Sequence, residues 1–362
     1  MSRDKNHWRL LDTGLRPAAE NMALNKTLLE MHQEGVIPHT LRFLQFPPSA
    51  LIGFHQSVEQ ELREDYCREQ GIAIQRRITG GGAIYFDQTQ IGWELYLDKQ
   101  VMGTADMGEI AKRICTAAAK GISALGVNAV FRPRNDIEVD GKKVSGTGGA
   151  FDGDSILYQG TLLVDFDVER MLRVLKIPAE KLNDKMIESA RDRVANLKDL
   201  LGSAPDLDDV KQSMMAAFAR EFDLTFDVTD TLTQAEQQRF EENLQEIDSE
   251  EWIHLQKKPA SASINVDGVY KTAGGLMRVT IGLDTERDHI KQLWITGDFF
   301  VNPRRMIVDL EAALKDTPVV DISRVINDFF DNYPVEMLML GRDDFISAIS
   351  STLAQGTVAA VG

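Results

Sequence analysis

One short stretch combines three consecutive glycines, Gly80, Gly81 and Gly82, with two arginines just upstream, Arg76 and Arg77. Glycine loses more backbone freedom on folding than any other residue, so such a run favours a sharp bend or a ligand that approaches the main chain. Cationic side chains beside exposed backbone N–H groups suit a phosphate or a carboxylate. The alternative is a glycine-rich turn with solvated arginines. Walker A and dinucleotide-binding patterns are absent, so an anion site here would belong to another class.

A second candidate segment follows from residue 132 to residue 149 and contains a hairpin signal. Asp140-Gly141 separates Ile137–Val139 from Lys142–Val144. Asp-Gly between β-prone runs favours a tight turn with positive φ. The hairpin leads into the run Ser145–Gly149, whose small residues would let a ligand approach the backbone. The two segments together predict a site made largely of backbone, with a few cations.

With their neighbours, these segments resemble the lipoate–protein ligase A family. No single piece is specific, but seven of them occur in family order with compatible spacing between about residues 8 and 200. The matching pieces are Asn21–Leu24, Gly53-x-x-Gln56, Arg76–Ala83, Arg134–Ile137, Asp140–Gly146, Gly160–Leu163 and Ser189–Leu197. The resemblance implies an α+β protein, with a mixed-sheet catalytic domain of the biotin/lipoate ligase type and a smaller α+β accessory domain.

The resemblance also implies a reaction. Such ligases use ATP and Mg²⁺ to activate free lipoate or octanoate as an acyl-adenylate. They then pass the acyl group to a lysine of a lipoyl carrier domain or lipoate-binding protein. Two anions must be brought together, so a cation between them is needed. By resemblance this catalytic residue is Lys143; taken alone, a lysine after an Asp-Gly turn is usually solvated. Lys142 should point to the opposite face of the strand, into solvent.

Further site residues are implied by the same resemblance. Arg77 falls near the adenylate or pyrophosphate, the glycine run forms a loop over the acyl-adenylate, and Asp136 is the metal candidate because Mg²⁺ prefers carboxylate oxygen. Taken alone, Asp136 could be an ordinary aspartate at a hairpin edge. The full set expected to bind the nucleotide comprises Arg77, Thr79, Gly80, Gly81, Gly82, Asn135, Asp136, Ser145, Gly146 and Thr147.

Three residues depart from the family pattern. Phe86 stands where many relatives carry histidine, Gly148 replaces a usual alanine, and Gln159 stands where histidine is common. None of them removes the lysine, the arginine or the glycine run. They bear on the preferred acid and on the carrier, and could mark a subgroup that serves lipoate-binding proteins of sulfur oxidation.

Two alternative functions remain. The first is an octanoyl or lipoyl transferase of the same fold, which uses no ATP and forms a thioester on a cysteine. In the most similar transferases that cysteine lies near residues 129–131, where this chain has Val130, which cannot be a nucleophile. The second is a paralogue that binds lipoate or an adenylate with weak activity; Phe86 and Gly148 favour it, and the retained Lys143 opposes it. The Gly-Arg-Gly-Arg signature of biotin ligases is missing.

Composition sets further limits. A chain of 362 residues with 43% hydrophobic and 27% charged residues is typical of a globular protein with two domains. The net charge of -16 disfavours nucleic-acid binding. No secretory or membrane-spanning run is apparent, so we expect no membrane partner and a cytoplasmic location. The two cysteines, Cys67 and Cys115, suit a reducing compartment and are expected to be structural. No zinc-site spacing is present.

The pattern of apolar residues predicts the elements and a domain boundary. We expect a catalytic domain over residues 1–250 and an accessory domain over residues 259–362, because residues 235–258 shift to a polar, acidic composition. Asp267-Gly268 is expected to form a turn between strands at 262–266 and 269–272. The other expected strands are 41–46, 72–78, 83–87, 91–97, 129–166 in several pieces, 276–283 and 290–296. The expected helices are 17–33, 58–70, 106–125, 168–175, 191–201, 207–221, 236–251, 303–315, 321–331 and 343–353.

Overall fold

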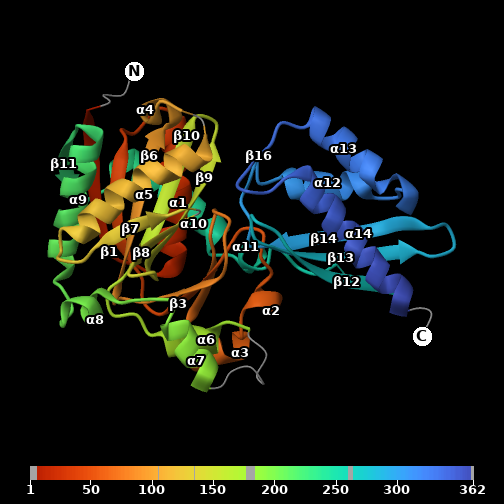
Figure 1. Cartoon of the computed structure of the whole chain (residues 1–362). Coiled ribbons are helices and arrows are strands. Elements are labelled where there is room, and N and C mark those ends of the chain that lie inside the picture. Colours follow the sequence, from red (N-terminus) through yellow and green to blue (C-terminus); the bar gives the residue numbers. More distant parts are fainter. Residues whose placement is uncertain (1–5, 105, 134, 177–183, 260–263, 360–362) are drawn as a thin grey trace. The chain divides into compact units, whose positions relative to one another are not determined.

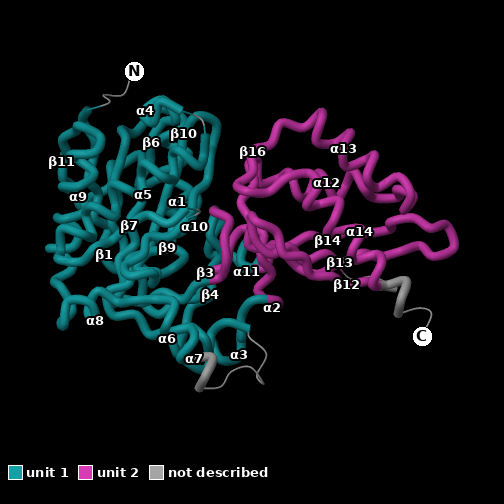
Figure 2. Tube along the Cα trace, in the orientation of Figure 1, with its two compact units in different colours: residues 1–51, 61–78, 84–253 teal, residues 52–60, 79–83, 254–362 magenta. Residues whose placement is uncertain are grey.

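The computed structural model describes residues 6–104, 106–133, 135–176, 184–259 and 264–359. The chain divides into two compact units, coloured separately in Figure 2. The first unit comprises Met1–Leu51, Glu61–Ile78 and Ile84–Ile253, and the second comprises Ile52–Gln60, Thr79–Ala83 and His254–Gly362. Two short segments from the N-terminal half therefore group with the second unit. The catalytic and accessory roles expected for the two parts of the chain remain predictions.

An eight-stranded sheet forms the centre of the first unit, in the order β11-β1-β2-β6-β10-β9-β8-β7. β1 runs parallel to β11 and β2, and the other neighbours are antiparallel, so the predicted mixed sheet of an α+β fold is confirmed. The strands are β1 His7–Leu15, β2 Thr40–Gln45, β6 Gln90–Asp98, β7 Ala129–Arg132, β8 Asp136–Val139, β9 Lys142–Asp152, β10 Ser155–Leu163 and β11 Thr225–Thr229.

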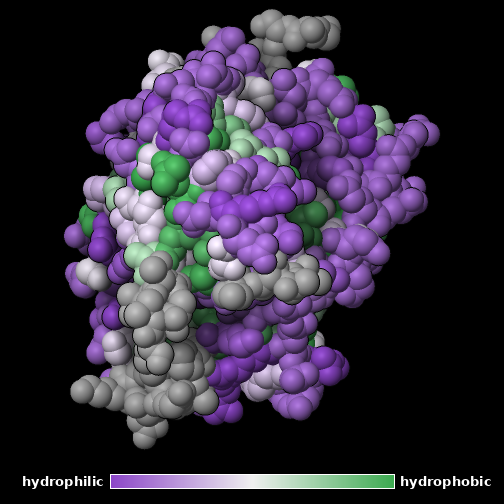
Figure 3. All heavy atoms as spheres, turned by 90° about the vertical axis from the view of Figure 1, so that its right-hand side faces the viewer, coloured by the Kyte–Doolittle hydropathy of each residue, from purple (hydrophilic) through white to green (hydrophobic). Residues whose placement is uncertain are grey.

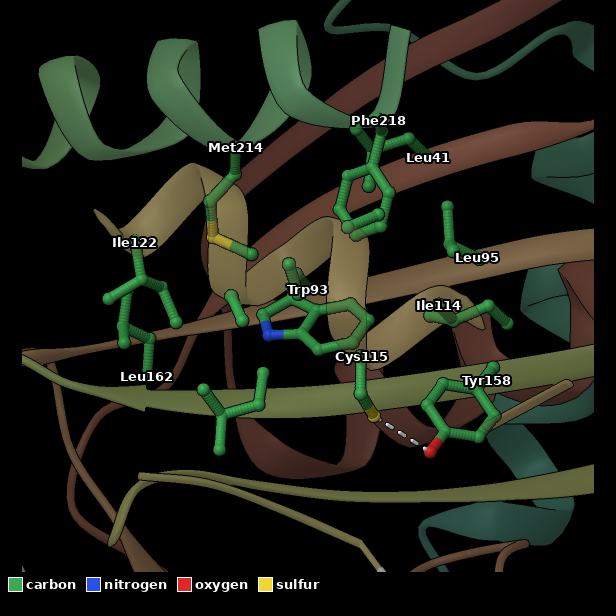
Figure 4. Packing of buried hydrophobic residues seen from close by; sticks show 14 of the residues in the cluster. Leu41, Trp93, Leu95, Ile114, Cys115, Ile122, Tyr158, Leu162, Met214 and Phe218 are labelled. Carbon is green, nitrogen blue, oxygen red and sulfur yellow. Dashed lines mark hydrogen bonds between the residues drawn. The ribbon is translucent and has the colours of Figure 1, made fainter. Parts of the chain in front are cut away.

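Helices cover both faces of this sheet (Figure 1). Helices α5, Met107–Ser123, and α9, Leu207–Phe222, pack on one face, and helices α1, Ala18–Gln33, and α10, Gln234–Ile247, pack on the other. Strand β6 is buried almost throughout because both of its faces meet a helix layer. Trp93 belongs to the core under α5 and α9, as Figure 4 shows.

Two predicted helices in the N-terminal two thirds of the sequence are wrong in part. The expected helix 58–70 is two short helices, since Leu62 leaves the helical path to form a bridge with Leu175. The expected helix 191–201 starts only at Leu197, because the backbone before it is extended and pairs with Lys143. The remaining elements of the first unit are β3 Ser49–Ile52, β4 Ala73–Arg76, β5 Ile84–Phe86, α3 Glu64–Glu69, α4 Lys99–Met102, α6 Val168–Val174, α7 Asp184–Arg191, α8 Leu197–Leu201 and α11 Glu250–Ile253. Helix α2, Val58–Glu61, groups mostly with the second unit.

The second unit has its own sheet and core. Three antiparallel strands pack against helices, and the predicted turn at Asp267-Gly268 is wrong because both residues lie within β12. Thr280 of the next strand donates to the Asp267 carboxylate, and a Cβ at Gly268 would lie 2.1 Å from the Thr352 hydroxyl. The elements are β12 Ile264–Lys271, β13 Leu276–Asp284, β14 His289–Gly297, β15 Val301–Asn302, β16 Glu336–Met337, α12 Met306–Leu314, the short 3-10 helix Val319–Asp321, α13 Ile322–Asn332 and α14 Arg342–Ala359. The residues expected to begin the first strand, 262 and 263, lie outside the described part.

Within the described ranges, we find no helix with the length and apolar character that crossing a membrane requires. The surface in Figure 3 is mostly hydrophilic, and hydrophobic residues gather near its centre. The large apolar residues fill separate cores in the two units.

Candidate active site

A tight turn connects strands β8 and β9 and carries the candidate lysine. Asp140 and Gly141 have φ values of 50° and 77°, so the predicted turn with positive φ is confirmed. Lys142 is 46% exposed and lies 3.8 Å from Asp192, on the side opposite to Lys143. The prediction that only the second lysine of the pair faces the site is consistent with this arrangement.

A β-bulge aims Lys143 at the metal candidate. Asp136 lies opposite Gly146, and Glu138 lies opposite Lys143, so β9 contains one more residue than β8 between these pairs; Val144 is the extra one. Side chains alternate along a strand, and the extra residue therefore moves Lys143 to the face that Asp136 and Gly146 share. Without the bulge, the lysine would point into the core.

The result is an accessible ion pair. Lys143 Nζ lies 2.7 Å from Asp136 Oδ1, and the two side chains remain 38% and 24% exposed. The lysine extends over Gly146, where a Cβ would lie 2.7 Å from Nζ. Among the described residues, Asp136 Oδ1 has no hydrogen bond of normal geometry. The pair therefore presents a cation and a hard carboxylate oxygen, which suit a phosphate or carboxylate anion and a divalent cation.

The family segment from Ser189 to Leu197 supports the lysine from its other edge. The Lys143 N–H donates to the Arg193 carbonyl and the Ala195 N–H donates to the Lys143 carbonyl, each at 2.9 Å. Val194 forms a parallel bridge with Lys143. Both backbone groups of the lysine are thus fixed, and only its side chain can move.

Three hydrogen bonds connect Asn135 with Thr147. The Thr147 N–H and Oγ1 donate to the Asn135 carbonyl at 2.8 Å and 3.0 Å, and Asn135 Nδ2 donates to the Thr147 carbonyl at 3.0 Å. Ser145 is fully buried on the core side of β9. The structure thus brings together Asn135, Asp136, Lys143 and Gly146, while Ser145 and Thr147 turn their side chains to the core and can face a nucleotide only with their backbones. Arg134, part of the family match, lies outside the described residues.

Arg77 is turned into the first unit. Its Nη1 donates to the Leu51 carbonyl at 2.8 Å, the side chain is 5% exposed, and burial lowers the pKa of the guanidinium to about 10. Arg76 is also buried and donates to the carbonyls of Trp252 and Ile253 at the end of α11. Neither arginine is a solvated cation, so the alternative of a turn with solvated arginines does not hold. The role of Arg77 toward a nucleotide remains a prediction.

The predicted glycine loop is packed within the second unit. The Phe54 N–H donates to the Thr79 carbonyl at 2.9 Å, and Gly81 has a φ of 94°. A Cβ at Gly80 would lie 2.4 Å from the Phe299 carbonyl oxygen, so no larger residue fits there without movement. Gly82 adjoins Asp298. Close backbone packing explains Gly80 and the positive φ explains Gly81, whereas a Cβ at Gly82 would make only ordinary contacts. The contact of the three glycines with an acyl-adenylate remains a prediction.

The three residues that depart from the family pattern lie in the core and on two neighbouring strands. Phe86 is buried and its ring centroid lies 4.6 Å from that of Phe46, so the residue contributes to the core. Gly148 and Gln159 lie directly opposite each other on β9 and β10. Two of the departures therefore form one cross-strand pair.

Sequence reasoning did not single out three residues around the site. Thr161 Oγ1 lies 3.4 Å from the Gly146 N–H, which donates to it. Cys115 and Tyr158 lie behind β9 and contact Thr147. Thr161 belongs to a matching family segment and could have been found there. Cys115 and Tyr158 carry no signal in the sequence, because they come from a helix and a strand that only the fold brings together.

Comparison with known proteins gives the relatives of this chain. Residues 17–219 match the model of the lipoyl protein ligase A/B catalytic domain. Lipoate-protein ligase A subunit 1 of Thermoplasma acidophilum is 29% identical over 243 residues, which cover 64% of this chain and 90% of that protein. Octanoyltransferase LipM of Geobacillus kaustophilus is 26% identical over 274 residues, 68% of this chain and 98% of that protein.

A solved structure agrees with these relatives. The crystal structure of a lipoate-protein ligase A bound with ATP superposes with a TM-score of 0.60 at 26% identity, over 69% of this chain and 98% of that one. The predicted fold of the biotin/lipoate ligase type is thereby confirmed. Because the family model covers more than half of the sequence, the chain belongs to the lipoyl protein ligase A/B family.

Proposed function

We propose that this protein is an ATP-dependent lipoate–protein ligase. In the first step, a carboxylate oxygen of lipoate or octanoate attacks the α-phosphorus of ATP, and the bond to the β-phosphate breaks to release pyrophosphate. In the second step, the amine of a carrier lysine attacks the acyl carbonyl and AMP leaves. The carrier would be a lipoyl domain or a lipoate-binding protein. Two free, buried thiols suit a reducing compartment such as the cytoplasm.

The accessible pair of Lys143 and Asp136 carries this proposal. The ammonium can contact a carboxylate and an α-phosphate together, which reduces the repulsion between them. Among the described side chains Asp136 contacts only the Lys143 ammonium, and its carboxylate fits a Mg²⁺ ligand. A bound Mg²⁺ would neutralise charge on the phosphate oxygens. The hydrogen bonds between Asn135 and Thr147 hold the backbone directly before Asp136.

The relative named as an octanoyltransferase favours a second candidate, a transferase that forms a thioester on cysteine. The cysteines of this chain argue against it. Cys67 and Cys115 are both fully buried, and burial raises the pKa of each thiol, to about 11 for Cys67. A buried neutral thiol is a poor nucleophile. Val130, at the position of the transferase cysteine, is 52% exposed and chemically inert.

Pyrophosphate release decides between these candidates. The full chain is incubated with ATP and Mg²⁺, and with lipoate, octanoate or no acid, in the absence of a carrier. Release that depends on the acid supports the ligase and identifies the preferred acid. No release with either acid from folded protein would contradict the proposal, and transfer of octanoyl from a carrier without ATP would establish the transferase.

A further inference from the structure

A buried chain of polar side chains lies behind the hairpin on the face opposite to Lys143. Cys115 Sγ on α5 lies 3.2 Å from the Tyr158 hydroxyl on β10, and that hydroxyl lies 2.9 Å from Thr147 Oγ1 on β9. Thr147 Oγ1 donates to the Asn135 carbonyl at 3.0 Å. Figure 4 shows the first of these contacts within the apolar core around Trp93. These hydrogen bonds therefore connect the middle of α5 with Asn135, the residue before Asp136.

The hydrogen bonds of this chain have one consistent direction. The Thr147 hydroxyl gives its proton to Asn135, so the Tyr158 hydroxyl must donate to Thr147, and Tyr158 can then accept from the Cys115 thiol. This direction requires a neutral thiol and a neutral phenol. Burial raises the pKa of both groups, so both stay protonated at neutral pH. Such aligned bonds in a low-dielectric interior reinforce one another.

The chain ends where the candidate site begins. Asn135 receives two hydrogen bonds on its carbonyl from Thr147, and the next residue is Asp136, whose carboxylate contacts Lys143. A rotation of the 135–136 peptide would move this carboxylate away from the lysine. Because Tyr158 sits on a central strand buried on both sides, it provides a rigid support for that peptide.

We propose that Tyr158 is a positioning residue, which acts through Thr147 and Asn135 to aim Asp136 at the metal and at Lys143. This inference rests on the proposed ligase activity. A purely structural role for Tyr158 would affect the stability of the fold and leave the metal requirement unchanged. A positioning role affects the metal requirement, since groups that orient a metal ligand typically change metal affinity by about 10- to 100-fold.

The first test measures the Mg²⁺ concentration for half-maximal pyrophosphate release. Tyr158→Phe and Thr147→Val should raise it about tenfold, with a smaller change in the KM for the acid. Thr147→Ser keeps the hydroxyl and should need the same Mg²⁺ concentration as the unmodified protein. Cys115→Ala should have the smallest effect, since the thiol is a weak donor at the far end. Tyr96→Phe is the matched control, because it removes another buried tyrosine hydroxyl, one that donates to Glu94.

The second test does not depend on the activity. Hydrogen exchange of the Thr147 amide, which donates to Asn135, should become faster in Tyr158→Phe and stay unchanged in Tyr96→Phe. An unchanged amide overturns the inference even if no variant releases pyrophosphate. Faster exchange without any pyrophosphate release, in the unmodified protein as well, would support the positioning contact and reject the ligase reaction. An unchanged Mg²⁺ requirement in active Tyr158→Phe overturns the role in metal binding.

Discussion

Two ion pairs on the same face of the large sheet differ in how accessible their charged groups are to a ligand. Arg42 and Glu94 lie opposite each other on β2 and β6, with side chains 0% and 3% exposed. Lys143 and Asp136 on β9 and β8 remain 38% and 24% exposed. The closest approach is 3.0 Å in the first pair and 2.7 Å in the second. Distance therefore does not distinguish them.

The difference lies in the other partners. Glu94 accepts from two side chains and Arg42 donates to two more, so the pair is saturated by the protein. Asp136 has only the ammonium as a side-chain partner among the described contacts. A saturated buried pair cannot offer a lone pair to a ligand, whereas the open pair can. The additional partners of the buried pair are Asn25, Tyr96, Thr13 and Asn21.

The largest expected effect on stability comes from breaking the buried pair of Arg42 and Glu94. Arg42→Met would leave the Glu94 carboxylate buried without its counter-ion, which costs about 3–5 kcal/mol. Denaturant unfolding of the full chain should show this loss, while the folded fraction keeps its pyrophosphate release. Arg68→Met is the control, since Arg68 is 76% exposed beside Asp65 and should cost less than about 0.5 kcal/mol. Equal losses in both variants would contradict the comparison.

Removing Lys143, the cation of the accessible pair, should lower the activity and leave the stability nearly unchanged. Lys143→Ala should reduce acid-dependent pyrophosphate release by about 100- to 1000-fold, because one charge-stabilising donor is lost. The unfolding free energy should stay nearly constant, since the side chain is half-exposed. Lys142→Ala, on the opposite side of the strand, is the matched control and should release pyrophosphate normally. Near-normal release by Lys143→Ala would disprove the assignment of this lysine.

The open pair can also be disturbed without removing a charge. A Cβ at Gly146 would lie 2.7 Å from Lys143 Nζ, so Gly146→Ala should displace the ammonium, which is the flexible end of its side chain. We expect pyrophosphate release to fall about 10- to 100-fold, as for other small misplacements of a reacting group. The melting temperature should change little. A fall in melting temperature that accounts for the whole loss of rate would show that the backbone moved instead.

The contrast between the pairs explains how far the sequence could predict this molecule. The Asp140-Gly141 turn, the alternation of Lys142 and Lys143, and the long apolar strands and helices follow from local pattern, and the structure confirms them. Asp267-Gly268 has the same local signal as the first turn, yet it lies inside a strand. Neighbouring residues from β13 and α14 decide that case, and local pattern does not contain them.

The site shows the same limit at the level of side chains. Alternation alone would place Lys143 and Gly146 on opposite faces, and only the bulge at Val144 brings them together. Arginine side chains are long enough to point either way, so the type and position of Arg77 did not reveal that it is buried. The sequence could therefore indicate which residues belong to the candidate site. The direction of each side chain depended on pairing between strands that are distant in the sequence.

A third case is a half-buried carboxyl, Glu311, which has no counter-ion among the described ion pairs. Glu311 on α12 accepts from the Ile295 N–H at 2.6 Å, and burial raises the pKa of this carboxyl from 4.5 to about 7. Between these values the folded state holds a proton that the unfolded state has lost. Stability from this group is therefore complete below pH 4.5 and is lost as pH rises through about 7.

Glu311→Gln should remove this pH dependence, because the amide keeps an acceptor for Ile295 but cannot ionise. The variant should be more stable than the unmodified protein above pH 7, by about 1.4 kcal/mol for each tenfold difference in proton affinity between the folded and unfolded states. Hydrogen exchange of the β14 amides between pH 5 and 8, corrected for intrinsic rates, measures the effect locally. The exposed Glu286→Gln is the control and should leave the profile unchanged. A profile for Glu311→Gln that still falls with pH would mean that another group of the second unit titrates in this range.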